Sequence, residues 1–248
     1  MAGPLPAVEL KKLASVDSPT IANIIELFGV QSRIAGYVNS SIRAVYPDLP
    51  PTVGYAVTAT FRSAYPTTGQ GDVYDTLSAI IEGGEKTEGP AFMVVEDLDD
   101  PPVSATYGEV MATAMIAAGY VGLATSGGGR DYEQVKALKL PCFANSMIVA
   151  HGFCHFESSG TTVTLGGLTV NPGDLLHGDA NGIVKIPEHL APHVSRFIEP
   201  YMAAEEIMMS YLRKGNVNFK DAAKVQHEMR DAQEALAKEA AALIAGNG

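Results

Sequence analysis

Three charged residues of this sequence, Glu109, Arg130 and Asp131, are of the types that bind a metal ion and an anionic substrate, and their spacing could bring them together. Residues 110–129, between the first two, hold an expected helix, a strand and a glycine loop, a connection long enough to return the chain beside its start. We therefore expect the two carboxylates to meet. Two carboxylates suit a hard divalent cation such as Mg²⁺, and a guanidinium suits bidentate contact with a substrate carboxylate.

Gly108 and Glu109 are expected to open a helix. The first backbone N–H groups of a helix lack partners within it, so they form a ready anion site where a substrate carboxylate can dock. The alternative is structural, because an Arg-Asp pair before a short helix is often a helix cap with a surface ion pair. Spacing alone leaves both interpretations open.

Other polar groups give weaker signals. The loop Ser126–Gly129 follows a strand but matches neither the dinucleotide-binding nor the Walker glycine motif. His151 and His155 are predicted on one face of a strand, about 13 Å apart along it, which is too far for one zinc ion. We expect structural roles for these histidines, and equally for His177 and Asp179.

The composition is that of a folded, soluble protein, and a cytoplasmic location is expected. Of 248 residues, 46% are hydrophobic, and no apolar run reaches the roughly 18 residues that a membrane span needs. The first residues are not expected to act as a secretory signal, because proline interrupts their short apolar stretch and the lysines follow it. A formal net charge of −11 argues against nucleic acid as a partner. An oxoacid site on such a chain needs a local cation, for which Arg130 is the candidate. Cys142 and Cys154 are expected to be reduced and structural.

Helices and strands that position these residues alternate in the first half of the sequence, and the second half is rich in predicted strands. Helices are predicted at residues 17–29, 72–82 (ended by Gly83-Gly84), 108–118 and 132–138. Strands are predicted at residues 53–61, 90–95, 120–125, 142–147, 149–157, 161–165, 168–170 and 182–186. The acidic stretch 96–102 is expected to be a solvated loop. This order predicts layered sheets with helices on one side.

Residues 189–248 are expected to form a helical extension of two helices. The first carries a regular apolar stripe. Its members are Phe197, Tyr201, Ala204, Met208 and Tyr211. We expect this stripe to make packing or subunit contacts, with its burial in an oligomer, and not to contact a membrane or a cofactor.

Several motifs together resemble the RraA-like family. That family contains the regulators of ribonuclease E activity and the 4-hydroxy-4-methyl-2-oxoglutarate/4-carboxy-4-hydroxy-2-oxoadipate aldolases. The motifs are Gly108-Glu109-x-x-Ala112, the acid-x20-Arg-Asp spacing, Phe143-Ala144, Pro172–Asp179 and Gly182–Pro187. The resemblance covers roughly residues 15–187 and implies a layered β/β/α domain over residues 1–188, assembled as a homotrimer or homohexamer.

The resemblance also implies roles for the charged residues. Asp131 would bind Mg²⁺ or Mn²⁺, Glu109 would hold metal-bound water, and Arg130 would bind the oxoacid carboxylate. The residues implied to bind substrate are Arg130, Gly108, Val110 and Met111, with the last two using backbone N–H groups. Many members carry Asp-Gly where this chain has Ser126-Gly127, so metal affinity or substrate choice is expected to differ.

The expected activity is that of a metal-dependent carbon–carbon lyase acting on a small 2-oxoacid through a metal-stabilised enolate. Aldol cleavage and oxaloacetate-type decarboxylation share that intermediate, and no residue separates them. The alternative from another class is a non-catalytic regulatory binding protein. Asp131 argues against it, because the ribonuclease-regulating members typically lack an acid after the arginine. A sugar-acid lyase of the same family is a third possibility.

Overall fold

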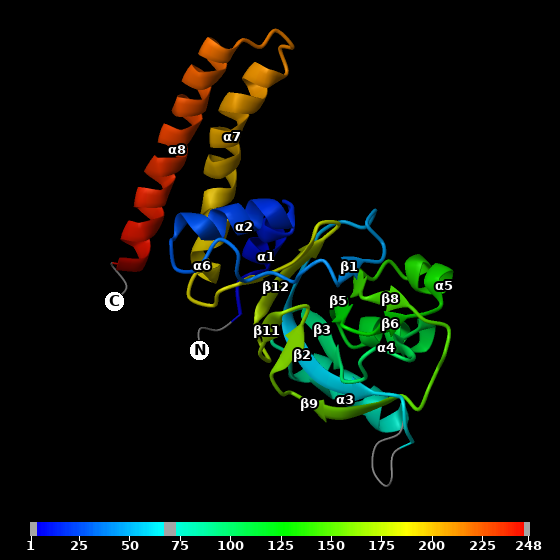
Figure 1. Ribbon diagram of the computed structural model, residues 1–248. Helices are drawn as coiled ribbons and strands as arrows, with labels where there is room; N and C mark the ends of the chain where they lie inside the picture. The colour runs from blue at the N-terminus through cyan, green and yellow to red at the C-terminus, as the bar shows by residue number, and fades with distance from the viewer. Residues whose placement is uncertain (1–3, 67–72, 246–248) are drawn as a thin grey trace.

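The computed structural model describes residues 4–66 and 73–245 and confirms the α/β fold (Figure 1). Within these residues, eight strands form the main sheet in the order β1-β7-β5-β3-β2-β12-β13, with β9 paired to β2. Four adjacent strands, β7, β5, β3 and β2, are parallel, and the remaining pairs are antiparallel. The bounds are β1 Arg43–Ala44, β2 Thr52–Arg62, β3 Ala91–Asp97, β5 Tyr120–Thr125, β7 Cys142–Ala144, β9 His155–Ser159, β12 Leu175–Asp179 and β13 Gly182–Ile186.

The two faces of this sheet are covered by different elements, which gives the layered β/β/α arrangement. Because successive side chains of a strand point to opposite faces, Met93 and Val95 of β3 pack among helical side chains, whereas Phe92 and Val94 face the β10–β11 hairpin. The helices on the first face are α3 (Val73–Lys86), α4 (Glu109–Ala117) and α5 (Tyr132–Ala137). The hairpin strands are β10 (Val163–Leu165) and β11 (Leu168–Val170).

Helix α3 continues through Gly83 and Gly84, where the sequence predicted its end; Asp72, its predicted first residue, lies outside the described residues. The reason is close packing. A Cβ at Gly83 would lie 2.6 Å from the Val57 side chain, and one at Gly84 would lie 3.0 Å from the Ala118 side chain. These glycines therefore let the helix approach its neighbours instead of ending it.

A second, three-stranded sheet within the described residues positions the candidate site. Its parallel strands are β4 (Ala105–Tyr107), β6 (Gly128–Gly129) and β8 (Ser146–Met147). The glycine segment predicted to be a loop is thus partly a strand. A Cβ at Gly129 would lie 2.5 Å from the Tyr107 ring, so the absence of a side chain allows β6 to lie beside β4.

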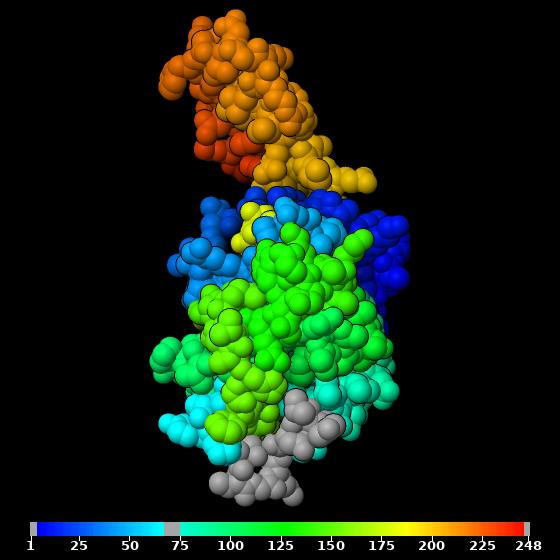
Figure 2. All heavy atoms as spheres, turned by 90° about the vertical axis from the view of Figure 1, so that its right-hand side faces the viewer, coloured from blue at the N-terminus to red at the C-terminus, as the bar shows by residue number. Residues whose placement is uncertain are grey.

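The remaining helices form one end of the molecule. They are α1 (Ala7–Leu13), α2 (Ser18–Leu27), α6 (Ala191–Val194), the 3₁₀ turn η1 (Ser195–Phe197), α7 (Ile198–Leu212) and α8 (Phe219–Ala245). Helices α7 and α8 make an antiparallel hairpin that stands clear of the body (Figures 1 and 2). None of the helices among the described residues is long and apolar enough to cross a bilayer.

The predicted burial of the apolar stripe in an oligomer is wrong for its first members. Phe197 and Tyr201 are already buried within the chain, at 2% and 6% exposure. Phe197 packs edge-on against Phe28 of the α2 C-terminus, with ring centroids 5.3 Å apart. One face of the hairpin base is therefore part of the core, and the exposed apolar side chains of α7 are those of Met202, Met209 and Leu212.

Candidate functional site

The structure brings the backbone of Glu109, the side chain of Arg130 and the carboxylate of Asp131 together. The Glu109 N–H donates to Asp131 Oδ2 at 2.9 Å, and Arg130 Nε lies 3.7 Å from the same oxygen. The small sheet makes this possible, because the Arg130 N–H donates to the Tyr107 carbonyl at 3.0 Å. Positions far apart in the sequence thus meet at the N-terminus of α4.

Asp131 has an unusual backbone that aims its side chain at this point. Its φ of 56° and ψ of 47° are left-handed, a conformation that Asp and Asn tolerate better than other residues with a side chain. The carboxylate does not cap its own helix, α5, but reaches α4 instead. This differs from the simple cap considered from the sequence.

Gly108 is required by the same contact. A Cβ at this position would lie 2.5 Å from Asp131 Oδ2 and 3.0 Å from Arg130 Nε. Its φ of −149° suits any residue, so the requirement is for space and not for backbone freedom. Glycine at position 108 therefore leaves room for both side chains in their present positions.

The helix terminus supplies positive potential to the site. Val110 and Met111 lie in the first turn of α4, where backbone N–H groups have no carbonyl of the same helix to bind. Val110 is 71% exposed, so this turn faces solvent. The Glu109 side chain is exposed too, and its carboxylate is not among the contacts of Asp131. The sequence predicted contact between the two carboxylates, whereas the structure joins Asp131 to the backbone N–H of Glu109.

These residues fit a weakly held Mg²⁺ better than a cation enclosed by protein ligands. No cluster of three or more His, Cys, Asp or Glu side chains that could hold a metal occurs among the described residues. Mg²⁺ commonly binds one or two carboxylates and completes its octahedron with water and substrate oxygens. Asp131 is 37% exposed, and exposed Glu109 lies beside it, so both carboxylates are accessible for such a role.

A small depression adjoins the charged residues. Its lining includes Gly108, Met111, Arg130, His151 and Cys154. The sequence predicts His151 and His155 on one strand, but β9 begins only at His155, and His151 lies in the preceding loop. Gly152, with a φ of 60°, interrupts the strand pattern and was the available signal.

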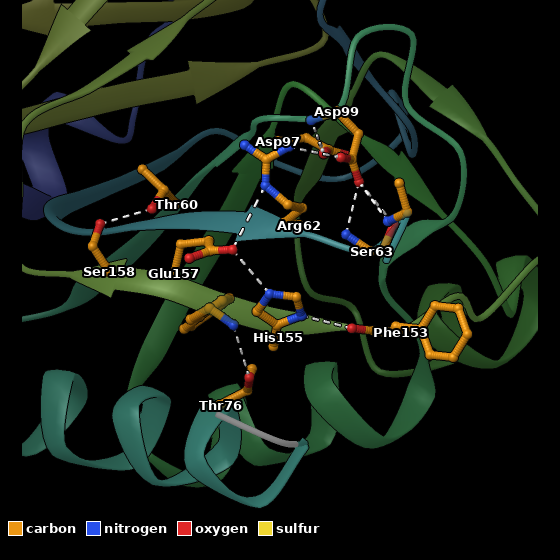
Figure 3. Close-up of polar contacts among 12 residues, drawn as sticks. Thr60, Arg62, Ser63, Thr76, Asp97, Asp99, Phe153, His155, Glu157 and Ser158 are labelled. Carbon is orange, nitrogen blue, oxygen red and sulfur yellow. Dashed lines mark hydrogen bonds and ion pairs between the residues drawn. The ribbon is translucent and has the colours of Figure 1, made fainter. Parts of the chain in front are cut away.

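His155 has the structural role predicted for it. It is buried, and its two ring nitrogens lie 2.7 Å from the Phe153 carbonyl oxygen and 3.0 Å from Glu157 Oε1. Figure 3 shows the Glu157 carboxylate between His155 and Arg62, whose Nε is 3.6 Å away. Arg62 also contacts Asp99 at 3.3 Å. This network ties β9 to β2 and to the loop after β3.

The stretch predicted to be a solvated loop contains buried carboxylates. Asp99 is 7% exposed and accepts hydrogen bonds from Ser63 and from the Ala64 N–H. Asp97 Oδ2 is buried without a hydrogen-bond partner, and burial raises the pKa of Asp97 to about 6. The Asp97 N–H donates to Ser126 Oγ at 2.8 Å, and a Cβ at Gly127 would lie 2.5 Å from Asp97 Oδ2, so this carboxyl group lies beside Ser126 and Gly127.

His177 and Asp179 also have structural roles, as predicted. Ser18 Oγ lies 2.9 Å from His177 Nδ1, and the Ser18 N–H donates to Asp179 Oδ2 at 3.0 Å. Burial lowers the pKa of His177 and favours its neutral form. Both residues therefore fasten α2 to β12.

Comparison with known proteins assigns the family. The family model described as RraA-like, aldolase/RraA, matches residues 21–185. The chain belongs to the RraA-like family. The resemblance seen in its motifs is thereby confirmed, and the family contains both aldolases and RraA proteins.

Individual RraA-like relatives are distant. One is an uncharacterized protein of Methanocaldococcus jannaschii, 35% identical over 85 residues, which are 31% of this chain and 37% of that protein. Another, from Halalkalibacterium halodurans, has a name that proposes a 4-hydroxy-4-methyl-2-oxoglutarate aldolase; it is 27% identical over 137 residues, 55% of this chain and 63% of that protein. The chain thus matches less than two thirds of the length of either relative.

The RraA-like fold is shared with solved structures. The crystal structure of Streptomyces coelicolor RraAS2, named as an unusual member of the RNase ES inhibitor RraA family, superimposes with a TM-score of 0.64. The two chains are 20% identical, and the match covers 83% of this chain and 97% of that one. At this identity the likeness shows the fold alone.

Proposed function

We propose that this RraA-like protein is a divalent-metal-dependent carbon–carbon lyase that acts on a small 2-oxoacid. The observation that carries the proposal is the convergence of Asp131, Arg130 and the N-terminus of α4 on one exposed point. An acid, a guanidinium and free N–H groups are what binding a cation and an oxoacid together requires. The name of the Halalkalibacterium halodurans relative supports this reaction class.

Each group has a role in the proposed site. Asp131 and Glu109 would hold Mg²⁺ or Mn²⁺. The bound cation would polarise the 2-oxo group and offset the negative charge that develops there when the carbon–carbon bond breaks. Arg130 would bind the substrate carboxylate through two N–H donors. The backbone N–H groups of Val110 and Met111 would donate to the same carboxylate.

One observation favours a second candidate. Asp131 Oδ2 already accepts from the Glu109 N–H and lies near Arg130, so these contacts have a structural value without any substrate. A regulatory binding protein of the RraA type would use them in this way. The partly exposed Asp131 carboxylate separates the two candidates. Binding a metal ion needs it, whereas regulation through a protein surface does not.

A substrate screen tests the proposal. Purified protein would be offered 4-hydroxy-4-methyl-2-oxoglutarate, oxaloacetate and sugar-derived 2-oxoacids with Mg²⁺ or with EDTA, and pyruvate would be measured with lactate dehydrogenase. We expect pyruvate above the protein-free rate with Mg²⁺ and not with EDTA. Protein-free controls containing Mg²⁺ are essential, because the metal itself promotes oxaloacetate decarboxylation. If no 2-oxoacid is cleaved with Mg²⁺ or Mn²⁺ present, the proposed activity is wrong.

A further inference from the structure

The loop that carries His151 is fixed against the candidate site at three points. The Ile148 N–H donates to the Gly129 carbonyl at 2.9 Å, next to Arg130. The Ala150 carbonyl accepts from the Ala105 N–H at 2.9 Å, and the Phe153 N–H donates to the Ser63 carbonyl at 2.9 Å. These bonds hold His151 at the depression that Arg130 and Gly108 also line.

Gly152 allows the loop to come this close. A Cβ there would lie 2.8 Å from Ser104 Oγ and 3.0 Å from the Ser63 side chain, and its φ of 60° disfavours other residues. The loop therefore turns sharply just after His151.

The His151 ring is oriented by its neighbours. Nδ1 lies 3.2 Å from the Gly152 carbonyl oxygen and 3.7 Å from Cys154 Sγ. A carbonyl only accepts, so this contact favours the tautomer with the proton on Nδ1. The other nitrogen, Nε2, then has its lone pair free, and no partner for it is found among the described residues.

The other groups around the depression cannot exchange protons readily. Burial raises the pKa values of the Cys154 thiol and the Tyr107 hydroxyl, which keeps both protonated. A guanidinium group does not release its proton in proteins. An imidazole takes up and releases a proton near neutral pH. Of the described residues that line the depression, His151 is the one suited to both steps.

We propose that His151 is the proton carrier of this site, a catalytic residue for the 2-oxoacid chemistry. In aldol cleavage, Nε2 takes the proton of the C4 hydroxyl group. The C3–C4 bond then breaks, its electron pair forms the enolate of pyruvate, and C4 becomes a carbonyl carbon. The same proton passes from Nε2 to C3 and gives pyruvate. In decarboxylation Nε2 takes its proton from solvent and passes it to C3 after CO₂ has left.

This inference rests on the proposed function, and exchange of pyruvate protons tests it separately. Pyruvate in D₂O with Mg²⁺ should lose its methyl proton signal by NMR when wild-type protein is added. His151→Gln should slow this exchange by about 100-fold, within the range typical of general acid–base catalysis. Its affinity for oxalate, an analogue of the enolate, should change less than about threefold. His227→Gln, on the exposed surface of α8, is the matched control and should exchange at the wild-type rate.

Each other outcome overturns the inference. Wild-type exchange in His151→Gln would show that another group carries the proton. Parallel loss of exchange and oxalate binding would make His151 a binding or structural residue. If wild-type protein cleaves 2-oxoacids without exchanging pyruvate protons, the proposed role of His151 is wrong, while the proposed function stands. If wild-type protein does neither, the proposed function itself fails.

Discussion

At the scale of single residues, Arg130 and Asp131 are neighbours with opposite charges and separate proposed roles. Arg130→Lys keeps the charge but replaces a planar fork with one ammonium group, so bidentate contact with the substrate carboxylate is lost. A charge-assisted bidentate contact contributes about 2 to 4 kcal/mol, so kcat/KM should fall by roughly 30- to 1000-fold. Mg²⁺ affinity should hardly change, because the Arg130 to Asp131 contact is long and partly exposed.

Two titrations of the same Arg130→Lys preparation make this check, one of Mg²⁺ binding and one of substrate turnover. Parallel collapse of both would mean that Arg130 holds the metal site together. No change in either would leave Arg130 as an ordinary surface ion pair.

Asp97 predicts a specific pH dependence of stability. Its folded pKa of about 6 lies above the ordinary value of 3.8 because the carboxyl group is buried. The folded state therefore binds this proton more tightly than the unfolded state. The stability it contributes is complete below about pH 3.8 and is lost as the pH rises through about 6.

Asp97→Asn should remove this loss while the amide oxygen still accepts from the Asp99 N–H. Between pH 4 and pH 7, wild type should lose about 1 to 3 kcal/mol of unfolding free energy that Asp97→Asn does not lose. Urea unfolding at both pH values measures it, with exposed Asp100→Asn as the control. Parallel pH profiles for Asp97→Asn and wild type would contradict the assignment.

Among the helices and strands, the sequence predicts those whose signals are hydrophobic periodicity or a local cap. The hydrophobic strand at residues 120–125 and the helix capped by Asp17 occur as predicted, because burial and capping depend on neighbouring residues. The errors arise where tertiary contacts override local signals. The pair Gly83-Gly84 predicts a helix end from its composition, but the helix continues, and both glycines allow close packing against Val57 and Ala118.

The candidate site shows the same division. Glu109, Arg130 and Asp131 could be found from their types and spacing, whereas the left-handed backbone of Asp131 and the place of His151 could not. His151 was misplaced because residues 149–157 have a strand-like composition. Its loop conformation depends on bonds to Ala105 and Ser63, which are distant in sequence.

The junction between β4 and α4 gives a prediction about Gly108. Gly108→Ala places a methyl group 2.5 Å from Asp131 Oδ2, so the carboxylate must move away from α4. We expect a loss of about 1 to 3 kcal/mol in the free energy of unfolding and reduced metal-dependent turnover. In an Asp131→Ala background the same substitution should cost less, because the main clash is gone. An equal cost in both backgrounds would show that Asp131 is not what constrains Gly108.

At the scale of the whole molecule, the projecting hairpin is the strongest sign of assembly. Met209 and Leu212 of α7, and Phe219 at the start of α8, are 43%, 40% and 90% exposed. We expect copies of this chain to cover part of this surface in a trimer or hexamer, since burying apolar area contributes about 25 cal/mol per Å². Light scattering of the intact protein measures its mass. A monomer at micromolar concentration would contradict this prediction.

In the proposed function, Asp131 binds a cation and does not only accept a hydrogen bond from the N-terminus of α4. Asp131→Asn separates these roles, because asparagine tolerates the left-handed backbone and its amide oxygen can still accept from the Glu109 N–H, while the negative charge is lost. Asp131→Ala removes both functions and should also lose about 1 kcal/mol of stability.

The decisive measurement is pyruvate formation by Asp131→Asn against Mg²⁺ concentration, beside wild type and with unfolding curves for both proteins. The stability of Asp131→Asn should equal that of wild type within about 0.5 kcal/mol. Turnover should fall by at least about 100-fold, more than loss of an outer-shell partner usually causes. Wild-type turnover by Asp131→Asn, still abolished by EDTA, would show that the cation is held elsewhere and that Asp131 is not its ligand.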